Sequence, residues 1–151
     1  MGTVLITEVL PAASHQKPLL SSMLERNLSE LGAPRKYPYL ESYWSDPARY
    51  PFLIMSAGQV AGFALVRRLN ARNELEMAEF YVVPEFRRAG IGRAAAQALF
   101  ARFPVKWRVS VLDSNTVGGL FWSQVVPSET PAQIKNGRKV FSFSTHGKHA
   151  A

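Results

Sequence analysis

The sequence predicts a mixed α/β fold, with antiparallel strands in its first half and one parallel β-α-β crossover near its middle. Apolar runs of strand length, separated by turn residues, occur three times between residues 52 and 83. Residues 16–31 and 91–103 instead repeat their apolar side chains every three or four positions, as amphipathic helices do. A chain of 151 residues suits one hydrophobic core, so we expect residues 1–151 to form a single domain.

The N-terminal third is expected to contain a strand, a helix and an aromatic-rich segment. Residues 3–9 have the composition of a strand. A helix is expected over residues 16–31, and Pro34 prevents its continuation. Its apolar face consists of Leu20, Met23, Leu24, Leu28 and Leu31. Residues 33–51 are rich in proline and aromatic residues, and we expect a short second helix within them.

The middle of the chain predicts three successive strands. Residues 52–55 and 60–66 flank a turn at Ala57-Gly58-Gln59, which indicates a hairpin. The second run is apolar at odd and even positions alike, so we expect its strand to be covered on both faces. A turn at Asn70–Asn73 then leads into a strand over about residues 75–83.

The C-terminal half continues with two helices and three further strands. The helix expected after residue 90 has an apolar stripe of Ile91, Ala95, Leu99 and Phe103, and Pro104 ends this helix. Residues 107–111 alternate apolar and polar, which predicts a strand with one buried face. A short helix over 115–124 and a hairpin at Asn136-Gly137 complete the order β-α-α-β-β-β-α-β-α-β-β.

Composition excludes several classes of protein. The chain has 47% hydrophobic residues and a formal charge of +7, which is typical of a globular protein that attracts anions. Cysteine is absent and there are three histidines, so we expect neither disulfides nor a bound metal. No apolar stretch reaches about 20 residues and no signal peptide is recognisable, so we expect a cytoplasmic protein without membrane partners. The cationic residues are scattered, which disfavours nucleic acid as a partner.

The strongest functional signal is the segment Val82-Val-Pro-Glu-Phe-Arg-Arg-Ala-Gly-Ile-Gly-Arg93. A strand ends, a short loop turns, and two glycines open a helix, where backbone N–H groups lack intrahelical acceptors. Glycine lets an anion approach the backbone closely, and Arg87, Arg88 and Arg93 add positive charge. The segment therefore predicts a site for a diphosphate.

Two other interpretations compete with a diphosphate site. Gly90 and Gly92 can simply permit a tight turn, with the neighbouring arginines solvated. The pattern Gly90-x-Gly92-x-x-Ala95 also fits a dinucleotide fingerprint, with Asp113 as its ribose-binding acid. Against a dinucleotide fold, residues 84–89 separate the strand from the first glycine, and the flanking hairpins do not build a doubly wound parallel sheet.

The run Arg87-Arg88-Ala89-Gly90-Ile91-Gly92 resembles the R/Q-x-x-G-x-G/A signature of the GNAT superfamily of acetyl-CoA-dependent N-acetyltransferases. The strand end Val82-Val83-Pro84, the later Asn115 and the order of elements extend the resemblance over nearly all of the chain. The pair Phe121-Trp122 is similar to that of a bacterial subgroup of the superfamily. The resemblance implies a GNAT-like acyl-CoA N-acyltransferase fold with the parallel crossover at the cofactor site.

The resemblance also implies acetyl-CoA as the acetyl donor, with no metal. Phe80, Tyr81 and Val82 would offer backbone hydrogen bonds to the pantetheine arm, and an N–H near Val82 would polarise the thioester carbonyl. Asn115 would contact the cofactor near its thioester. The diphosphate would lie on the backbone and side chains of Arg87, Arg88, Ala89, Gly90, Ile91, Gly92 and Arg93.

The expected reaction needs a base, because amines are mostly protonated at neutral pH. Strand alternation places Glu76 on the face of Phe80 and Val82, and Glu79 on the opposite face with Tyr81. Glu79 lies among apolar neighbours that should raise its proton affinity, and Glu76 occupies a position where several family members keep a catalytic glutamate. The alternative is ion pairs between the glutamates Glu74, Glu76 and Glu79 and the arginines Arg67, Arg68 and Arg72. We favour the ion pair for Glu74 and function for Glu79.

One position departs from the family pattern. Seven residues after Asn115, where the family usually places a tyrosine that protonates the leaving thiolate, this chain has Trp122. An indole N–H donates a hydrogen bond but does not release its proton near neutral pH. Either the thiolate leaves unassisted, or Tyr81, Ser123 or a tyrosine of residues 37–50 replaces the acid. Trp122 either contacts the cofactor or packs beneath it.

The expected function is N-acetylation of a primary amine, on a small molecule or peptide, by direct transfer from acetyl-CoA in a ternary complex. The alternatives are a non-catalytic sensor of CoA or a nucleotide, an NAD-binding Rossmann-like protein and a nucleic-acid-binding domain. The sequence leaves a homodimer open.

Overall fold

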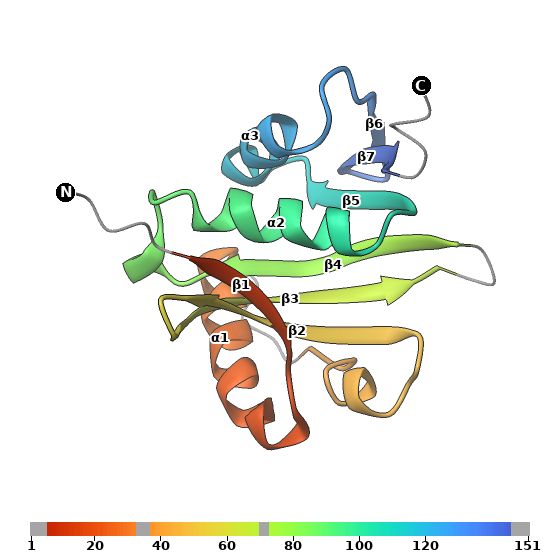
Figure 1. The fold of residues 1–151 in the computed structure, drawn as a ribbon. Coiled ribbons are helices and arrows are strands. Elements are labelled where there is room, and N and C mark those ends of the chain that lie inside the picture. Colours follow the sequence, from red (N-terminus) through yellow and green to blue (C-terminus); the bar gives the residue numbers. More distant parts are fainter. Residues whose placement is uncertain (1–5, 33–36, 70–72, 146–151) are drawn as a thin grey trace.

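The computed structural model describes residues 6–32, 37–69 and 73–145, which form a seven-stranded sheet with helices on both faces (Figure 1). The strands lie in the order β1-β2-β3-β4-β5-β7-β6. Their bounds are β1 (Thr7–Pro11), β2 (Arg49–Ser56), β3 (Gln59–Arg68), β4 (Glu74–Val82), β5 (Lys106–Leu112), β6 (Ala132–Lys135) and β7 (Arg138–Ser144). The helices are α1 (Lys17–Glu30), α2 (Ile91–Arg102) and α3 (Thr116–Val125), with short 3₁₀ turns η1 (Ser14–Gln16), η2 (Glu41–Trp44) and η3 (Pro84–Phe86).

The pairing of the strands confirms the expected mixed sheet. Every neighbouring pair is antiparallel except β4 and β5, which are parallel and joined by α2. The Rossmann-like alternative is therefore wrong, because a doubly wound sheet is built mainly from parallel strands. The expected second helix is the 3₁₀ turn η2. Residues 3–5 of the first expected strand and residues 70–72 of the expected turn lie outside the described residues.

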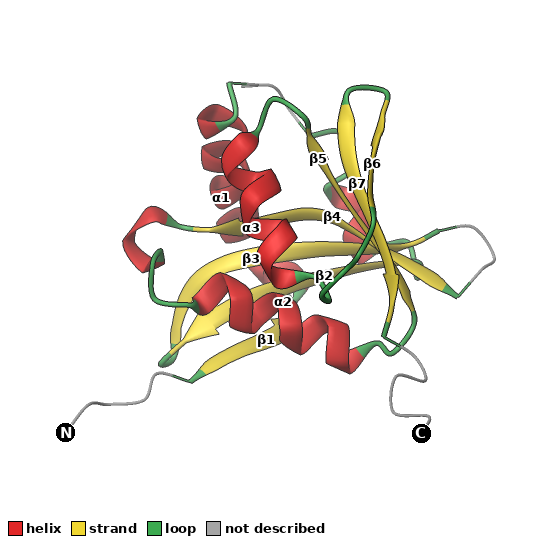
Figure 2. Ribbon diagram, turned by 90° about the horizontal axis from the view of Figure 1, so that it is seen from above, coloured by secondary structure: helices red, strands yellow, loops and turns green. Residues whose placement is uncertain are grey.

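Helices α1 and α2 lie on opposite sides of the sheet (Figure 2), and each face of the sheet carries a hydrophobic cluster. One packs α2 and α3 on the sheet and centres on Leu99 and Trp107, both fully buried. The other lies under α1 and η2 and includes Leu20 and Phe63, also fully buried. Strand β3 contributes side chains to both clusters, which confirms that it is covered on both faces. Within the described ranges no helix has the length and apolar character needed to cross a membrane.

A β-bulge in β4 changes which side chains share a face. Leu65 of β3 pairs with Glu79 and Val66 pairs with Met77, so Ala78 is an extra residue. Met77 and Phe80 consequently contribute to the same cluster on the α2 side. The simple alternation expected from the sequence is wrong at this point: Glu76 does not share a face with Phe80 and Val82. It lies on the α1 side, together with Glu79.

Strands β4 and β5 separate after only four paired positions. Their parallel register runs from Glu74 and Lys106 to Met77 and Val109. Strand β4 continues to Val82, whereas the rest of β5 pairs with β7 alone. Among the described residues, Ala78–Val82 therefore have no strand partner on the side of β5. An unpaired strand edge presents backbone N–H and C=O groups to a ligand.

Candidate active site

The loop that follows β4 gathers backbone N–H groups without acceptors. Arg88 and Gly90 both have positive φ, +64° and +77°, with residue 89 between them at negative φ. In the described chain, none of the backbone N–H groups from Arg88 to Arg93 donates a hydrogen bond, and the first helical bond runs from Ala94 to the carbonyl of Gly90 at 3.0 Å. Consecutive free N–H groups in such a turn, at the positive end of a helix, form an anion-binding concavity.

Glycine is required at the two positions of this loop for different structural reasons. Gly90 adopts the left-handed conformation that side chains other than glycine rarely take, and a Cβ there would meet open space. A Cβ on residue 92 would instead lie 3.3 Å from Cε1 of Phe121 and 3.5 Å from Cγ2 of Val82. Gly92 therefore permits the close packing of α2 against β4 and α3.

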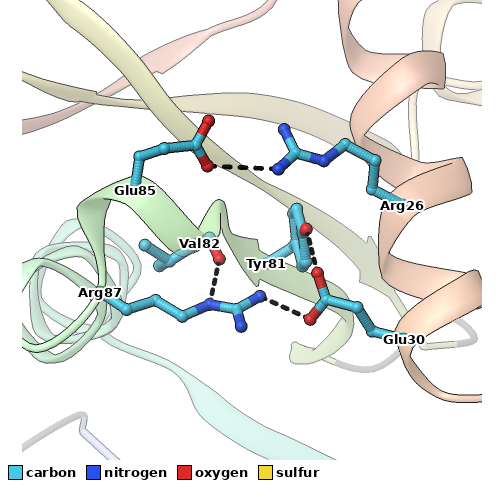
Figure 3. Close-up of polar contacts among 6 residues, drawn as sticks. All are labelled: Arg26, Glu30, Tyr81, Val82, Glu85 and Arg87. Carbon is cyan, nitrogen blue, oxygen red and sulfur yellow. Dashed lines mark hydrogen bonds and ion pairs between the residues drawn. The ribbon is translucent and has the colours of Figure 1, made fainter.

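The three arginines of the motif differ in their contacts. The guanidinium of Arg87 donates to the carbonyl of Val82 (2.8 Å) and to Glu30 (2.7 Å), so it joins the loop to β4 and α1 (Figure 3). Arg93 donates to the carbonyl of Gln124 at 2.9 Å, near the end of α3. Among the described residues, the Arg88 side chain makes no hydrogen bond or ion pair. Arg87 and Arg93 thus hold the loop in place.

Glu30 anchors the same loop through a second residue of β4. The hydroxyl of Tyr81 donates to Glu30 at 2.6 Å, and Arg26 pairs with Glu85 beside it at 3.2 Å (Figure 3). Burial opposes the charge of Glu30, but hydrogen bonds from Tyr81 and Arg87 lower the pKa of its carboxyl below the ordinary value. Burial, with the bonded carboxylate of Glu30, raises the pKa of Tyr81 to about 12. Tyr81 is consequently a poor candidate for the expected acid.

A cavity of about 560 Å³ opens where β4 and β5 separate, on the α1 side of the sheet. Met77 and Ala78 of β4 and Ser110 of β5 line it at the end of the parallel register. The rest of its wall comes from charged and aromatic side chains of distant segments: Tyr37, Tyr39, Arg49, Arg67, Glu76, Glu79 and Arg138.

The two glutamates in this cavity are in different electrostatic states. Glu76 accepts a hydrogen bond from Arg67 of β3 at 2.6 Å and lies 4.0 Å from Arg108 of β5, so it forms the ion pair that was the alternative to a catalytic role for this residue. Glu79 makes no hydrogen bond or ion pair with any described residue. Burial raises the pKa of Glu79 to about 7, although the charge of Arg138 opposes this rise. A carboxyl group with this pKa can accept and release a proton near neutral pH.

The remaining sequence-predicted residues belong to α3 or to its N-cap. Trp122 is buried, with its ring centroid 5.1 Å from that of Phe80 and 4.9 Å from that of Phe121, so it packs in the core beneath β4. Asn115 is the N-cap of α3, because its Oδ1 accepts from the N–H of Gly118 at 2.9 Å. The hydroxyl of Ser123 donates to the carbonyl of Leu120, which stabilises α3 internally.

Two tyrosines of residues 37–50, Tyr37 and Tyr39, line the cavity. Burial raises the pKa of Tyr37 above its ordinary value, so its phenol stays protonated and can donate a hydrogen bond. Sequence reasoning did not identify Glu30, Arg49 or Arg138 as site residues. The only local signal was the position of Arg138 directly after the Asn136-Gly137 turn, and nothing in the sequence indicated where that turn would lie.

Comparison with known proteins gives the class of this chain. The model of the "Acetyltransferase (GNAT) family" matches residues 18–116, which is more than half of the sequence. The protein therefore belongs to the GNAT acetyltransferase family, as its sequence motif and sheet topology had indicated. No curated protein matches the sequence.

Solved structures agree on the fold. An acetyltransferase from Thermus thermophilus superposes with a TM-score of 0.76 at 14% identity, covering 91% of this chain and 96% of the other. The ribosomal-protein-S18-alanine N-acetyltransferase from Escherichia coli gives 0.72 at 16% identity, covering 93% and 95%. The PaiA N-acetyltransferase from Thermoplasma acidophilum, solved in complex with coenzyme A, gives 0.69 at 14% identity, covering 92% and 99%.

Proposed function

We propose that this protein transfers an acetyl group from acetyl-CoA to a primary amine, by direct attack of the amine within a ternary complex. One observation carries the proposal. A run of free backbone N–H groups from Arg88 to Arg93 follows, after the short turn η3, a strand that is open between Ala78 and Val82. That arrangement suits an extended ligand with a diphosphate at one end and amide groups along its length.

The donor half of the site is made of backbone. The N–H groups of residues 88–93 hold the diphosphate, and the charge of the Arg88 side chain adds to them. The open edge of β4, including Phe80, Tyr81 and Val82, pairs with the amides of the pantetheine arm. The buried Trp122 of α3 packs against Phe80 of this edge, and Asn115 is the N-cap of the same helix. When bound there, acetyl-CoA supplies an activated acetyl group as a thioester.

The acceptor half of the site is the cavity on the α1 side. Glu79 takes a proton from the incoming ammonium group, because its pKa of about 7 leaves much of it ionised at neutral pH. Glu76 is paired with Arg67 and lies 4.0 Å from Arg108, so its carboxylate is already engaged. Proton transfer is therefore assigned to Glu79. Tyr37 lines the cavity and is the candidate hydrogen-bond donor to the departing sulfur. Its raised pKa makes it, like Tyr81, a poor source of a proton, so the sulfur leaves as a thiolate that a hydrogen bond stabilises.

The test combines binding with turnover. Calorimetry with CoA should give a measurable heat of association, and thiol release from acetyl-CoA should increase when a panel of primary amines is supplied. Binding of CoA without amine-dependent thiol release would leave the sensor as the function. Absence of CoA binding would overturn the proposal altogether, and steep weakening of nucleic-acid binding with salt would favour the nucleic-acid alternative.

A further inference from the structure

The cavity beside Glu79 has a surplus of positive charge in its walls. Three of its lining side chains are arginines, Arg49, Arg67 and Arg138, and two are glutamates. An acceptor that is only a cation would meet more repulsion than attraction here unless those arginines are neutralised. The charge of each arginine therefore determines which amines the cavity favours.

Two of these arginines form ion pairs with carboxylates. Arg49 pairs with Asp46 at 3.4 Å and lies over the rings of Tyr39 and Tyr43, with centroid distances of 5.4 and 5.2 Å. Arg67 pairs with Glu76, which also lies 4.0 Å from Arg108. A single carboxylate between two guanidinium groups does not leave negative charge for an ammonium ion.

Among the described residues Arg138 has no ion pair of this kind, and its charge acts on the carboxyl of Glu79. Its Nε donates to the hydroxyl of Ser110 at 2.7 Å and an NH2 hydrogen is directed at the Ser110 carbonyl at 3.3 Å, so β5 holds the guanidinium in place. Both of these acceptors are neutral, and within the described residues Arg138 forms no ion pair. The remaining N–H groups of a guanidinium fixed in this way suit a planar carboxylate.

Among its described lining residues the cavity thus presents one carboxyl without an ion pair, Glu79, and one guanidinium without an ion pair, Arg138. We infer that the acceptor is a small amine that also bears a carboxylate, an amino acid or a close analogue, with the amine at Glu79 and the carboxylate at Arg138. A volume of about 560 Å³ is that of a small-molecule site. A polyamine would need several unpaired carboxylates, and the described lining offers one. This inference rests on the proposed acetyl transfer.

The experiment compares matched acceptors. Thiol release from acetyl-CoA is measured with common amino acids, with the carboxamide of each, and with spermidine. We expect kcat/KM for the preferred amino acid to exceed that of its carboxamide at least about tenfold, a difference typical of one charge-assisted contact. Spermidine should be a poorer acceptor than that amino acid.

Variants assign the preference to Arg138. Arg138→Met should raise the KM for the amino acid about tenfold and leave the KM for acetyl-CoA unchanged, and Arg138→Lys should restore part of the loss. Arg68→Met removes one positive charge from the exposed end of β3, which lies outside the cavity lining, and should keep the preference. Arg138 is exposed, so its replacement should spare the fold.

Two results would overturn the inference, and they are distinguishable. Turnover with equal rates for acids and carboxamides, or fastest with spermidine, would refute the assigned substrate class while the acetyl transfer stands. Absence of thiol release with every amine would refute the acetyl transfer itself, and this inference with it.

Discussion

Replacing Glu79 with glutamine should make the protein more stable at alkaline pH while it abolishes most activity. The folded chain holds the pKa of this carboxyl at about 7, against an ordinary value of 4.5. Between these values the folded state binds more protons than the unfolded state, so stability falls as pH rises and levels off above about pH 7. At 1.36 kcal/mol per pKa unit, ionising Glu79 costs the folded state on the order of 3 kcal/mol, as an upper limit.

The assay is urea unfolding of both proteins at several pH values. Glu79→Gln removes the ionisable group and keeps its shape, so its free energy of unfolding should exceed that of the wild type by up to about 3 kcal/mol at pH 8. The difference should shrink as pH falls toward 4.5. Glu74→Gln, on the same strand but outside the cavity, is the control for the loss of one carboxylate.

Kinetics of the same variant test the role of Glu79 as a base. In the wild type kcat should rise with an apparent pKa near 7, and Glu79→Gln should lose about 100-fold in kcat together with that limb of the profile. A stability difference that does not change with pH would refute the reasoning about burial. An unchanged pH profile of kcat would place the base elsewhere.

Three further changes test the neighbouring elements. Gly92→Val should raise the KM for acetyl-CoA at least about tenfold, because the valine side chain collides with Phe121 and Val82 and moves the loop N–H groups. Ala94→Val, at an exposed position of the same helix, should leave this KM unchanged. Equal KM values for the two variants would contradict the proposed diphosphate site. Asn115→Ala should lower the free energy of unfolding by about 1 kcal/mol because the N-cap of α3 is lost, and Asn115→Asp should restore this stability. If the Asp variant is stable but turns over acetyl-CoA slowly, the amide of Asn115 also contacts the cofactor. Leu99→Ala should cost about 2–5 kcal/mol in urea unfolding because the side chain is fully buried beneath α2, and a loss below about 1 kcal/mol would contradict that packing.

Local chemistry allowed most of the fold to be predicted. Apolar periodicity separates the helix of residues 91–102 from the strands around it, because each element buries one face with its own period. The Asn136-Gly137 turn has positive φ at both positions, which few other residue pairs adopt, and so it fixed the last hairpin. The loop of free N–H groups was recognisable for the same reason at Gly90, whose positive φ glycine adopts readily.

The face of β4 that carries Glu76 and Glu79 could not be predicted in this way. Alternation assigned Glu76 and Glu79 to opposite faces, but the extra residue at Ala78 brings both into one cavity. A bulge is decided by how β4 pairs with β3, and no residue of β4 by itself marks it. The burial that raises the pKa of Glu79 was expected from its apolar neighbours, whereas the ion pairs of Glu76 required the positions of two other strands.

The sequence alone determined the order of elements, the positive charge and the loop of free N–H groups, because these depend on residues close together in the chain. Tertiary structure decided that Arg87 bonds to Glu30, that β4 and β5 part after Met77, and that Arg138 reaches the cavity of Glu79. Each of those features depends on segments that lie far apart in the chain. Their proximity follows from sheet register and packing, which only the folded chain sets.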